Sequence, residues 1–141
     1  MRKRKKYKFK KEALKSKEDA IKKANRYFDN AKETLRKSAI EYNAYQDSKY
    51  VSEASAMGYL AVLRAIDGYL LGIGAGDLPD SHEQYTYIIS KKIPKNGKLK
   101  NYYNIVYQNL HLLGYYRGGI GVEMIKEGFS SAKKIIQMLS K

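Results

Sequence analysis

Apolar residues recur at three- and four-residue intervals along most of this chain, and this spacing predicts amphipathic helices. The first series is Ile21, Ala24, Phe28, Ala31 and Leu35. Ser16 precedes it as the predicted N-cap, and Tyr42 lies one heptad beyond Leu35, so we expect a helix that extends to about Tyr45. No segment of the sequence shows sustained two-residue alternation, and we therefore expect no β-sheet.

Further helices follow from the same spacing. Residues 51–71 carry apolar side chains on most faces together with small residues that allow close helix approach, so this helix should be the most buried. We interpret the glycine string of 72–76 as its end, because the strand and the Gly-Lys-Ser/Thr ending of a phosphate loop are missing. A short helix capped by Asp80 or Ser81 comes next, and two last series cover 99–113 and 122–139.

These segments predict an all-α fold, in which four long helices form an antiparallel bundle and one short helix is added. We assign residues 16–141 to this single domain and residues 1–15 to a basic tail, which we expect to be flexible. With 141 residues, 43% of them apolar, the chain can bury a core that needs no cross-links. Its lack of cysteine excludes disulfides.

The positive charge is concentrated at one end of the chain. Twelve of the 28 basic residues lie in the first 23 positions beside three acids, so this stretch carries +9 of the net +14, whereas residues 24–76 sum to zero. This asymmetry indicates RNA or another polyanion as partner. The nucleic-acid-binding candidates are Arg2, Lys3, Arg4, Lys5, Lys6, Lys8, Lys10 and Lys11. A membrane-surface tag and a merely solubilising tail are the alternatives.

Several function classes lack the residues that they require. Without cysteine there is no thiolate–zinc site and no cysteine nucleophile, and two distant histidines give little support to a metal site, so we predict no metal and no cofactor. No apolar segment follows the basic start, which argues against a signal peptide. Arg64 and Asp67 interrupt the longest apolar run, so we expect no membrane span. The lack of cysteine fits a reducing cytosol, so we expect a cytoplasmic location.

The tyrosine-rich stretch around His111 holds one set of ligand-binding candidates. His111 and Tyr115 are four residues apart and Arg117 follows, so we expect them on one helix edge, with Tyr116 beside them. An imidazole, a phenol and a guanidinium together suit a phosphate or a nucleobase. The alternative is that the rings belong to the core edge and Arg117 caps helix carbonyls. His82, next to a cap position, is expected to be an exposed polar residue.

Arg64 and Asp67 are the most anomalous charges of the helical body, because they lie three residues apart in the segment that should be most buried. A structural i,i+3 ion pair is one interpretation. The other is that they line a polar cleft or a subunit interface, which makes both of them ligand-binding candidates. In either case buried charges need partners, so the pair should face something polar.

The helices resemble the HEPN-like helical domains of bacteria over about residues 16–141. The resemblance rests on Ala-Ile-x-x-Ala-x-x-Tyr-Phe-x-x-Ala-x-x-x-Leu35, on the central segment 56–70, on the tyrosine-rich stretch that ends at Arg117, and on the final helix. Such domains are small antiparallel bundles, often associated with minimal nucleotidyltransferases or with toxin–antitoxin and RNA-processing systems, and relatives commonly self-associate. The resemblance therefore implies a homodimer and a nucleotidyltransferase as candidate protein partner.

One departure from that family bears on activity. Its ribonuclease members carry Arg, four to six residues, then His on a late helix, whereas here His111 precedes Arg117 and no arginine precedes His82 or His111 at that spacing. We therefore expect a non-catalytic, HEPN-like binding module that contacts RNA or another polyanion through its basic N-terminus. A metal-independent ribonuclease or nucleotide-handling domain, and a purely structural oligomerising bundle, are the alternatives.

Overall fold

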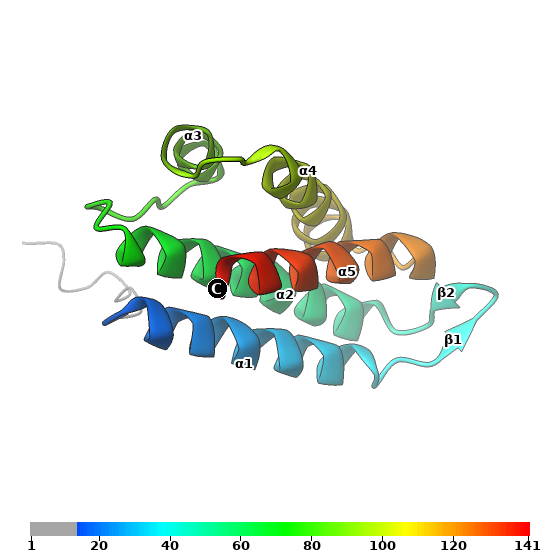
Figure 1. Ribbon diagram of the computed structural model, residues 1–141. Coiled ribbons are helices and arrows are strands. Elements are labelled where there is room, and N and C mark those ends of the chain that lie inside the picture. Colours follow the sequence, from blue (N-terminus) through cyan, green and yellow to red (C-terminus); the bar gives the residue numbers. More distant parts are fainter. Residues whose placement is uncertain (1–13) are drawn as a thin grey trace, which may run out of the picture.

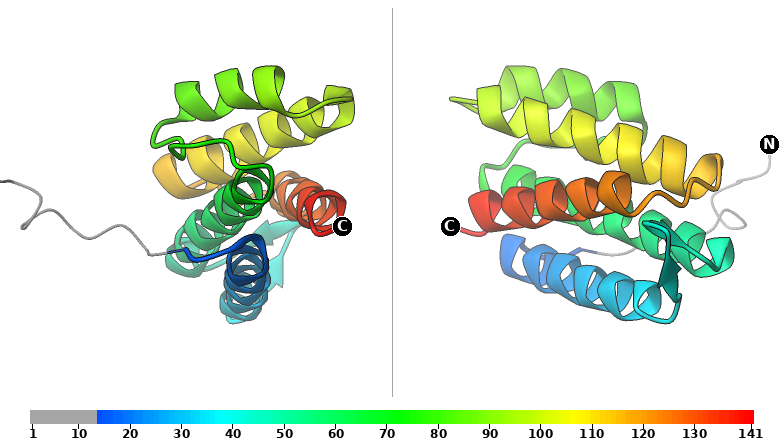
Figure 2. Two further views of the ribbon diagram at one scale, coloured as in Figure 1. Left: turned by 60° about the vertical axis from the view of Figure 1, so that its left-hand side comes forward. Right: turned by 90° about the vertical axis from the view of Figure 1, so that its right-hand side faces the viewer.

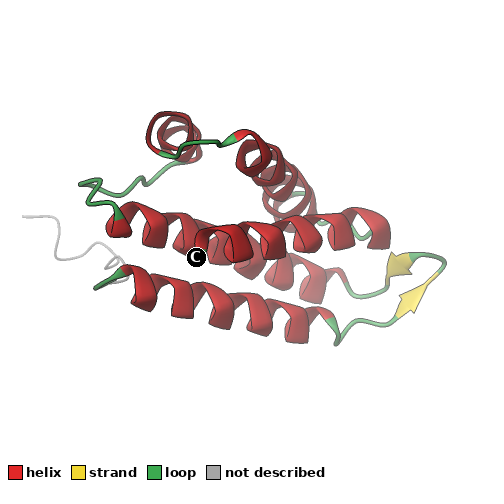
Figure 3. Ribbon diagram, in the orientation of Figure 1, coloured by secondary structure: helices red, strands yellow, loops and turns green. Residues whose placement is uncertain are grey.

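The computed structural model describes residues 14–141, so nearly all of the predicted basic tail lies outside it. The described residues are mostly helical, as predicted, and a short hairpin is the exception among them (Figure 3). The elements are α1 (Lys17–Leu35), β1 (Ile40–Glu41), β2 (Ala44–Tyr45), α2 (Ser48–Gly72), α3 (His82–Lys92), α4 (Gly97–Val106), the π-helix η2 (Tyr107–Tyr116) and α5 (Val122–Leu139).

The helices lie in a stack with α1 at one edge and α3 at the other (Figures 1 and 2). α1 runs opposite to α2, whereas α5 runs in the same direction as α2 (Figure 1). α2 is the central element, because it packs most extensively against α1 and also contacts η2 and α5. Val51, Val62, Ile66 and Leu70 of α2 are completely buried, as the apolar composition of this helix predicts.

α1 begins at its predicted cap. The Ser16 Oγ accepts a hydrogen bond from the Asp19 backbone N–H at 3.1 Å, and the acidic first turn opposes the positive end of the helix dipole. The buried residues of α1 are Ala20, Ala24, Phe28, Ala31 and Leu35. The predicted seam is therefore confirmed, with Ala20 rather than Ile21 fully buried at its start.

Among residues 14–141, every helix falls short of the combined length and hydropathy that crossing a bilayer requires.

Two expectations are wrong after Leu35. The helix ends there rather than near Tyr45, and residues 40–45 form an antiparallel hairpin. The register pairs Ile40 with Tyr45 and Glu41 with Ala44. Tyr42 and Asn43 make the turn with φ of 51° and 61°, and Tyr42 is 98% exposed, so its heptad spacing from Leu35 is coincidental. Strands of two residues are too short to show an alternating pattern in the sequence.

The predicted helix over residues 99–113 is present, but it changes type at Tyr107. From Tyr107 to Tyr116 the backbone is π-helical, and the Arg117 N–H donates to the Leu112 carbonyl, five residues back, at 2.9 Å. The wide turn brings Gly114 against α2, where a Cβ on Gly114 would lie 2.3 Å from the Ser55 Oγ. This contact between η2 and α2 therefore requires a glycine.

Gly114→Ala should lower the free energy of unfolding by about 1–3 kcal/mol, because the added methyl group overlaps Ser55 in a packed contact. Urea unfolding followed by far-UV circular dichroism measures the change. Gly97→Ala is the matched control, since nothing lies within 4 Å of a Cβ at that position. Adding Ser55→Gly should restore part of the lost stability. Equal stability of the two single variants would contradict the packing described.

Candidate functional site

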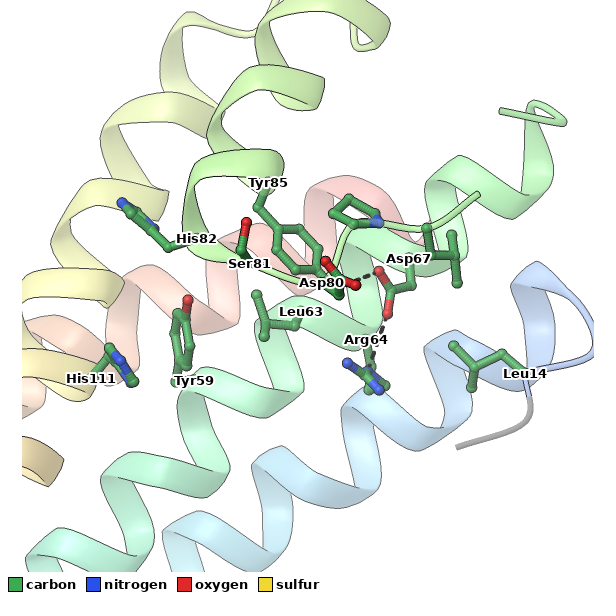
Figure 4. A pocket seen from close by; sticks show the side chains of 12 residues that line it. Leu14, Tyr59, Leu63, Arg64, Asp67, Asp80, Ser81, His82, Tyr85 and His111 are labelled. Carbon is green, nitrogen blue, oxygen red and sulfur yellow. Dashed lines mark hydrogen bonds and ion pairs between the residues drawn. The ribbon is translucent and has the colours of Figure 1, made fainter. Parts of the chain in front are cut away.

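A groove of about 430 Å³ opens among α2, α3 and η2 (Figure 4), within the size range of small-ligand sites. Its polar and charged lining consists of Tyr59, Arg64, Asp67, Asp80, Ser81, His82, Tyr85 and His111. Leu63, Leu78 and Pro79 add apolar surface. Leu14, the first described residue, lies at its edge (Figure 4).

α3 brings two side chains to the groove. The Ser81 Oγ accepts a hydrogen bond from the Gln84 N–H at 3.1 Å, which confirms the predicted cap of the short helix. His82 and Tyr85 follow three residues apart and therefore share one face of α3. Tyr85 is buried, and its hydroxyl donates a hydrogen bond to the Asp67 Oδ1 at 2.8 Å (Figure 4).

Asp67 occupies the polar end of the groove and is only 2% exposed. The Arg64 Nε lies 3.3 Å from the Asp67 Oδ2, so the predicted i,i+3 ion pair is present. Burial raises the pKa of the Tyr85 hydroxyl far above its usual value, and the Asp67 carboxylate raises it further. The Tyr85 phenol therefore stays protonated and acts as a hydrogen-bond donor to Asp67.

Six stacked rings, which we call the ring column, meet the other end of the groove, where Tyr59, His82 and His111 line it. The six rings are Tyr59 of α2, His82 of α3, Tyr103 of α4, and Tyr107, His111 and Tyr115 of η2. The four rings of α4 and η2 are spaced four residues apart. Along the π-helix the ring of His111 contacts those of Tyr107 and Tyr115, whereas Tyr103 of α4 joins the column through His82. The tightest contact joins His82 and Tyr107, whose ring centroids are 3.5 Å apart with planes 7° from parallel.

His111 lies at the centre of the ring column. Its ring centroid is 4.5 Å from that of Tyr59, 5.3 Å from that of Tyr107 and 6.1 Å from that of Tyr115. Tyr103 is buried at the inner end of the column, whereas Tyr115 at the outer end is 48% exposed. The column therefore connects the core to the surface.

Hydroxyl groups hold the inner end of the column together. The Tyr103 Oη lies 3.0 Å from the His82 Nδ1 and 3.3 Å from the Tyr59 Oη. Burial raises the pKa of Tyr103 well above its usual value, and its hydrogen bond with Tyr59 raises it further. His82 is thus a half-buried packing residue, and the expectation that it is an exposed polar side chain is wrong.

Both histidines are neutral near pH 7. Burial lowers the pKa of each below 6.5, and a charge on His111 would lower the pKa of His82 further. A neutral imidazole offers one N–H donor and one acceptor nitrogen. Within the described part of the chain, the ring nitrogens of His111 have no hydrogen-bond partner, so they are available to a ligand in the groove.

The structure brings four of the predicted ligand-binding residues to this region. Arg64 and Asp67 of α2 line the same groove as His111 of η2, and Tyr115 extends the ring column beside it. Figure 4 shows the Arg64–Asp67 pair at one end of the groove and His111 at the other. The groove therefore joins two sets of candidates that the sequence left separate.

The other predicted residues lie elsewhere. Tyr116 and Arg117 line a separate depression of about 440 Å³ on η2, so the structure does not bring the Arg117 guanidinium to His111 in one cavity. The basic candidates between Arg2 and Lys11 lie outside the described residues. Among residues 14–141, no group of three or more side chains is arranged to hold a metal ion.

Four rings of the site were not predicted, namely Tyr59, His82, Tyr103 and Tyr107. Part of the signal was present in the sequence, because rings recur every fourth position from Tyr103 to Tyr115. The same spacing is also expected for residues on the buried face of an ordinary helix, so it did not identify a site. The contributions of α2 and α3 depend on tertiary packing and carry no local signal.

Comparison with known proteins places the groove inside a recognised domain. Residues 19–141 match a family model described as "Domain of unknown function (DUF5618)". A solved structure, of a protein of unknown function from Dyadobacter fermentans, is 35% identical and has a TM-score of 0.77, with 89% of this chain and 98% of that chain covered. No curated protein matches the chain. These similarities support the fold and leave the ligand to be inferred from the site.

The protein should lose stability as the pH falls through the histidine range. Folding lowers the pKa of His82 and His111 below 6.5, so the unfolded state binds more protons there. The free energy of unfolding therefore decreases as the pH falls from about 7 to about 5. Thermal unfolding across this range measures the loss. A His82→Asn/His111→Asn variant should show a flatter dependence than the wild type, and an unchanged dependence would contradict this assignment.

Proposed function

The chain belongs to the DUF5618 family of domains of unknown function, and we propose that it is a non-catalytic module that binds single-stranded RNA. The observation that carries this proposal is the ring column. It extends from the buried Tyr103 to the exposed Tyr115, whose ring lies beside the groove. Unpaired bases stack on such rings with little dependence on sequence.

Tyr115 provides the surface on which a base would stack. The ring is 48% exposed, and within the described residues its ring contact is with His111 alone. The neighbouring Tyr116 is 73% exposed and offers a second aromatic surface. The free nitrogens of the neutral His111 ring are suited to hydrogen bonds with a base edge.

Phosphate contacts would come from the basic N-terminal segment. Leu14 lines the groove, and eight basic residues precede it in the sequence. Three peptide units separate Lys11, the last of these residues, from Leu14 and span at most about 11 Å, so the basic segment is joined to the chain close to the groove. Lysine and arginine side chains so tethered give sequence-independent, salt-sensitive affinity for a nucleic acid strand.

Binding without cleavage fits the state of the histidines. General acid–base cleavage of RNA needs one protonated and one neutral group, whereas burial favours the neutral form of both His82 and His111. The Arg-x4–6-His spacing of HEPN ribonucleases is also missing from the sequence. We therefore favour binding over the ribonuclease and nucleotide-handling alternatives.

We also propose that the helical body is HEPN-like and that the protein acts in the cytoplasm, since a chain without cysteine suits a reducing compartment. A homodimer is supported by exposed apolar side chains, because Leu113 and Ile120 are 42% and 39% exposed. A nucleotidyltransferase is the protein partner that the HEPN-like resemblance suggests.

Deletion of residues 2–11 should weaken the binding of a fluorescently labelled oligouridylate and flatten its salt dependence. If about five phosphates are contacted, the logarithm of the affinity of the intact protein should fall with the logarithm of the salt concentration at a slope of about −3.5. Fluorescence anisotropy at several potassium chloride concentrations measures both quantities. The oligonucleotide should remain at full length, because cleavage would favour the ribonuclease alternative. An equal slope for both proteins would contradict the proposed role of the segment.

Tyr115→Ala should weaken binding of the same oligonucleotide by about 1–3 kcal/mol, because one stacking surface is lost. Tyr87→Ala is the matched control, since Tyr87 is also an exposed tyrosine (64%) but contributes to neither the groove nor the ring column. A double-stranded RNA of the same length should bind more weakly than the single strand, because its bases are already stacked. Equal effects of the two substitutions would argue against stacking on Tyr115.

A further inference from the structure

A second pocket, of about 530 Å³, opens between α1, α5 and the β1–β2 hairpin, and we call it the α1–α5 pocket. We propose that it binds a small amphipathic anion, which has an apolar body and a single carboxylate or similar head group. The described lining residues of this pocket all differ from those of the groove, so this inference stands independently of RNA binding.

The floor of the α1–α5 pocket is apolar. Phe28 of α1 and Phe129 of α5 meet edge to face with ring centroids 6.0 Å apart, and Leu35 and Tyr45 lie beside them. All four side chains belong to the hydrophobic core and are buried. Burial raises the pKa of Tyr45, so its phenol is uncharged. Such a floor suits a hydrocarbon chain or an aromatic ring.

Four cations surround this floor. Lys32 of α1 and the C-cap residue Arg36 are four residues apart, and Lys126 and Lys133 are seven apart on α5, so each pair lies on one side of its helix. Among residues 14–141, no aspartate or glutamate lines the pocket. Within the described residues, none of the four cations forms an ion pair, although the Lys32 Nζ lies 5.7 Å from the centroid of the Phe28 ring.

The two sides of this cluster come from parts of the chain that differ in net charge. Residues 24–76, which include Lys32 and Arg36, have no net charge, whereas residues 77–141, which include Lys126 and Lys133, hold ten basic and five acidic residues and so carry +5. Like charges around one cavity repel one another, and a bound anion relieves that repulsion. The pocket continues along α1 and α5 into a smaller cavity that includes Asp29, which disfavours a second anionic group there.

Decanoate is a suitable probe, with decanol as its uncharged analogue and decyltrimethylammonium as its cationic analogue. Displacement of anilinonaphthalene sulfonate, a fluorescent amphipathic anion, reports occupancy in the full-length protein. We expect decanoate to displace the dye and to raise the temperature of thermal unfolding, whereas the two analogues do neither. Equal displacement by decanol and decanoate would overturn the proposal, because the cations would then contribute nothing.

Two substitutions on α5 locate the binding site. Ser130 is an exposed residue that lines the pocket. Ser130→Phe should therefore fill the cavity from the surface and lower the affinity for decanoate by about tenfold or more. Lys133→Gln should lower the affinity for decanoate by about two- to fivefold, which is the effect of losing one exposed ion pair. Lys134→Gln is the control, because the Lys134 Nζ instead lies 5.8 Å from the centroid of the Tyr102 ring, outside the pocket.

Circular dichroism and thermal unfolding without ligand check that each variant is folded. If Ser130→Phe does not fold, the difference between Lys133→Gln and Lys134→Gln still decides the question. Unchanged decanoate binding in a folded Ser130→Phe variant, or equal losses in the two lysine variants, would overturn the proposal. RNA binding should be the same in all three variants, which separates this test from that of the proposed function.

Discussion

The position of α3 depends on one buried carboxylate. Asp67 is 2% exposed in α2, where an unpaired charge would cost several kcal/mol. Arg64 neutralises it from the same helix, and the Tyr85 hydroxyl reaches it from α3. α3 otherwise packs chiefly against α4, so the hydrogen bond from Tyr85 ties it to α2. That attachment sets His82, one turn earlier, flat against Tyr107, and the ring column and the groove both depend on it.

The long helices were predictable because each of their turns buries an apolar residue, and this leaves a periodic pattern in the sequence. The seam of α1 follows the spacing from Ala24 to Leu35, and the Ser16 cap follows from local hydrogen bonding. The hairpin was not predictable, since two-residue strands leave no periodic pattern and Tyr42 happens to continue the heptad spacing. The π-helical backbone of η2 was not predictable either, because it is associated with a fit between Gly114 and Ser55, which are far apart in the sequence.

The candidate site was predictable only in parts. Arg64 and Asp67 were visible as charges in an apolar helix, and the structure adds Tyr85 as the partner that the buried pair required. Sequence spacing suggested Arg117 as a neighbour of His111, but the wide turn of η2 changes the direction of each successive side chain, and Arg117 lines another cavity. What joins His111 to the rest of the site is packing between α2, α3 and η2, which no local pattern encodes.

The groove and the α1–α5 pocket differ in charge, and this difference bears on how each selects a ligand. In the groove, the Arg64 cation is paired with Asp67, Asp80 adds a carboxylate, and burial favours the neutral form of both histidines. The described lining therefore has no excess of positive charge with which to attract phosphate. If the groove binds RNA as we propose, it would hold base rings by stacking, and the attraction for phosphate would come from cations outside it. The basic segment that precedes Leu14 contains such cations, so phosphate attraction and base stacking would reside in separate parts of the chain and could be varied independently.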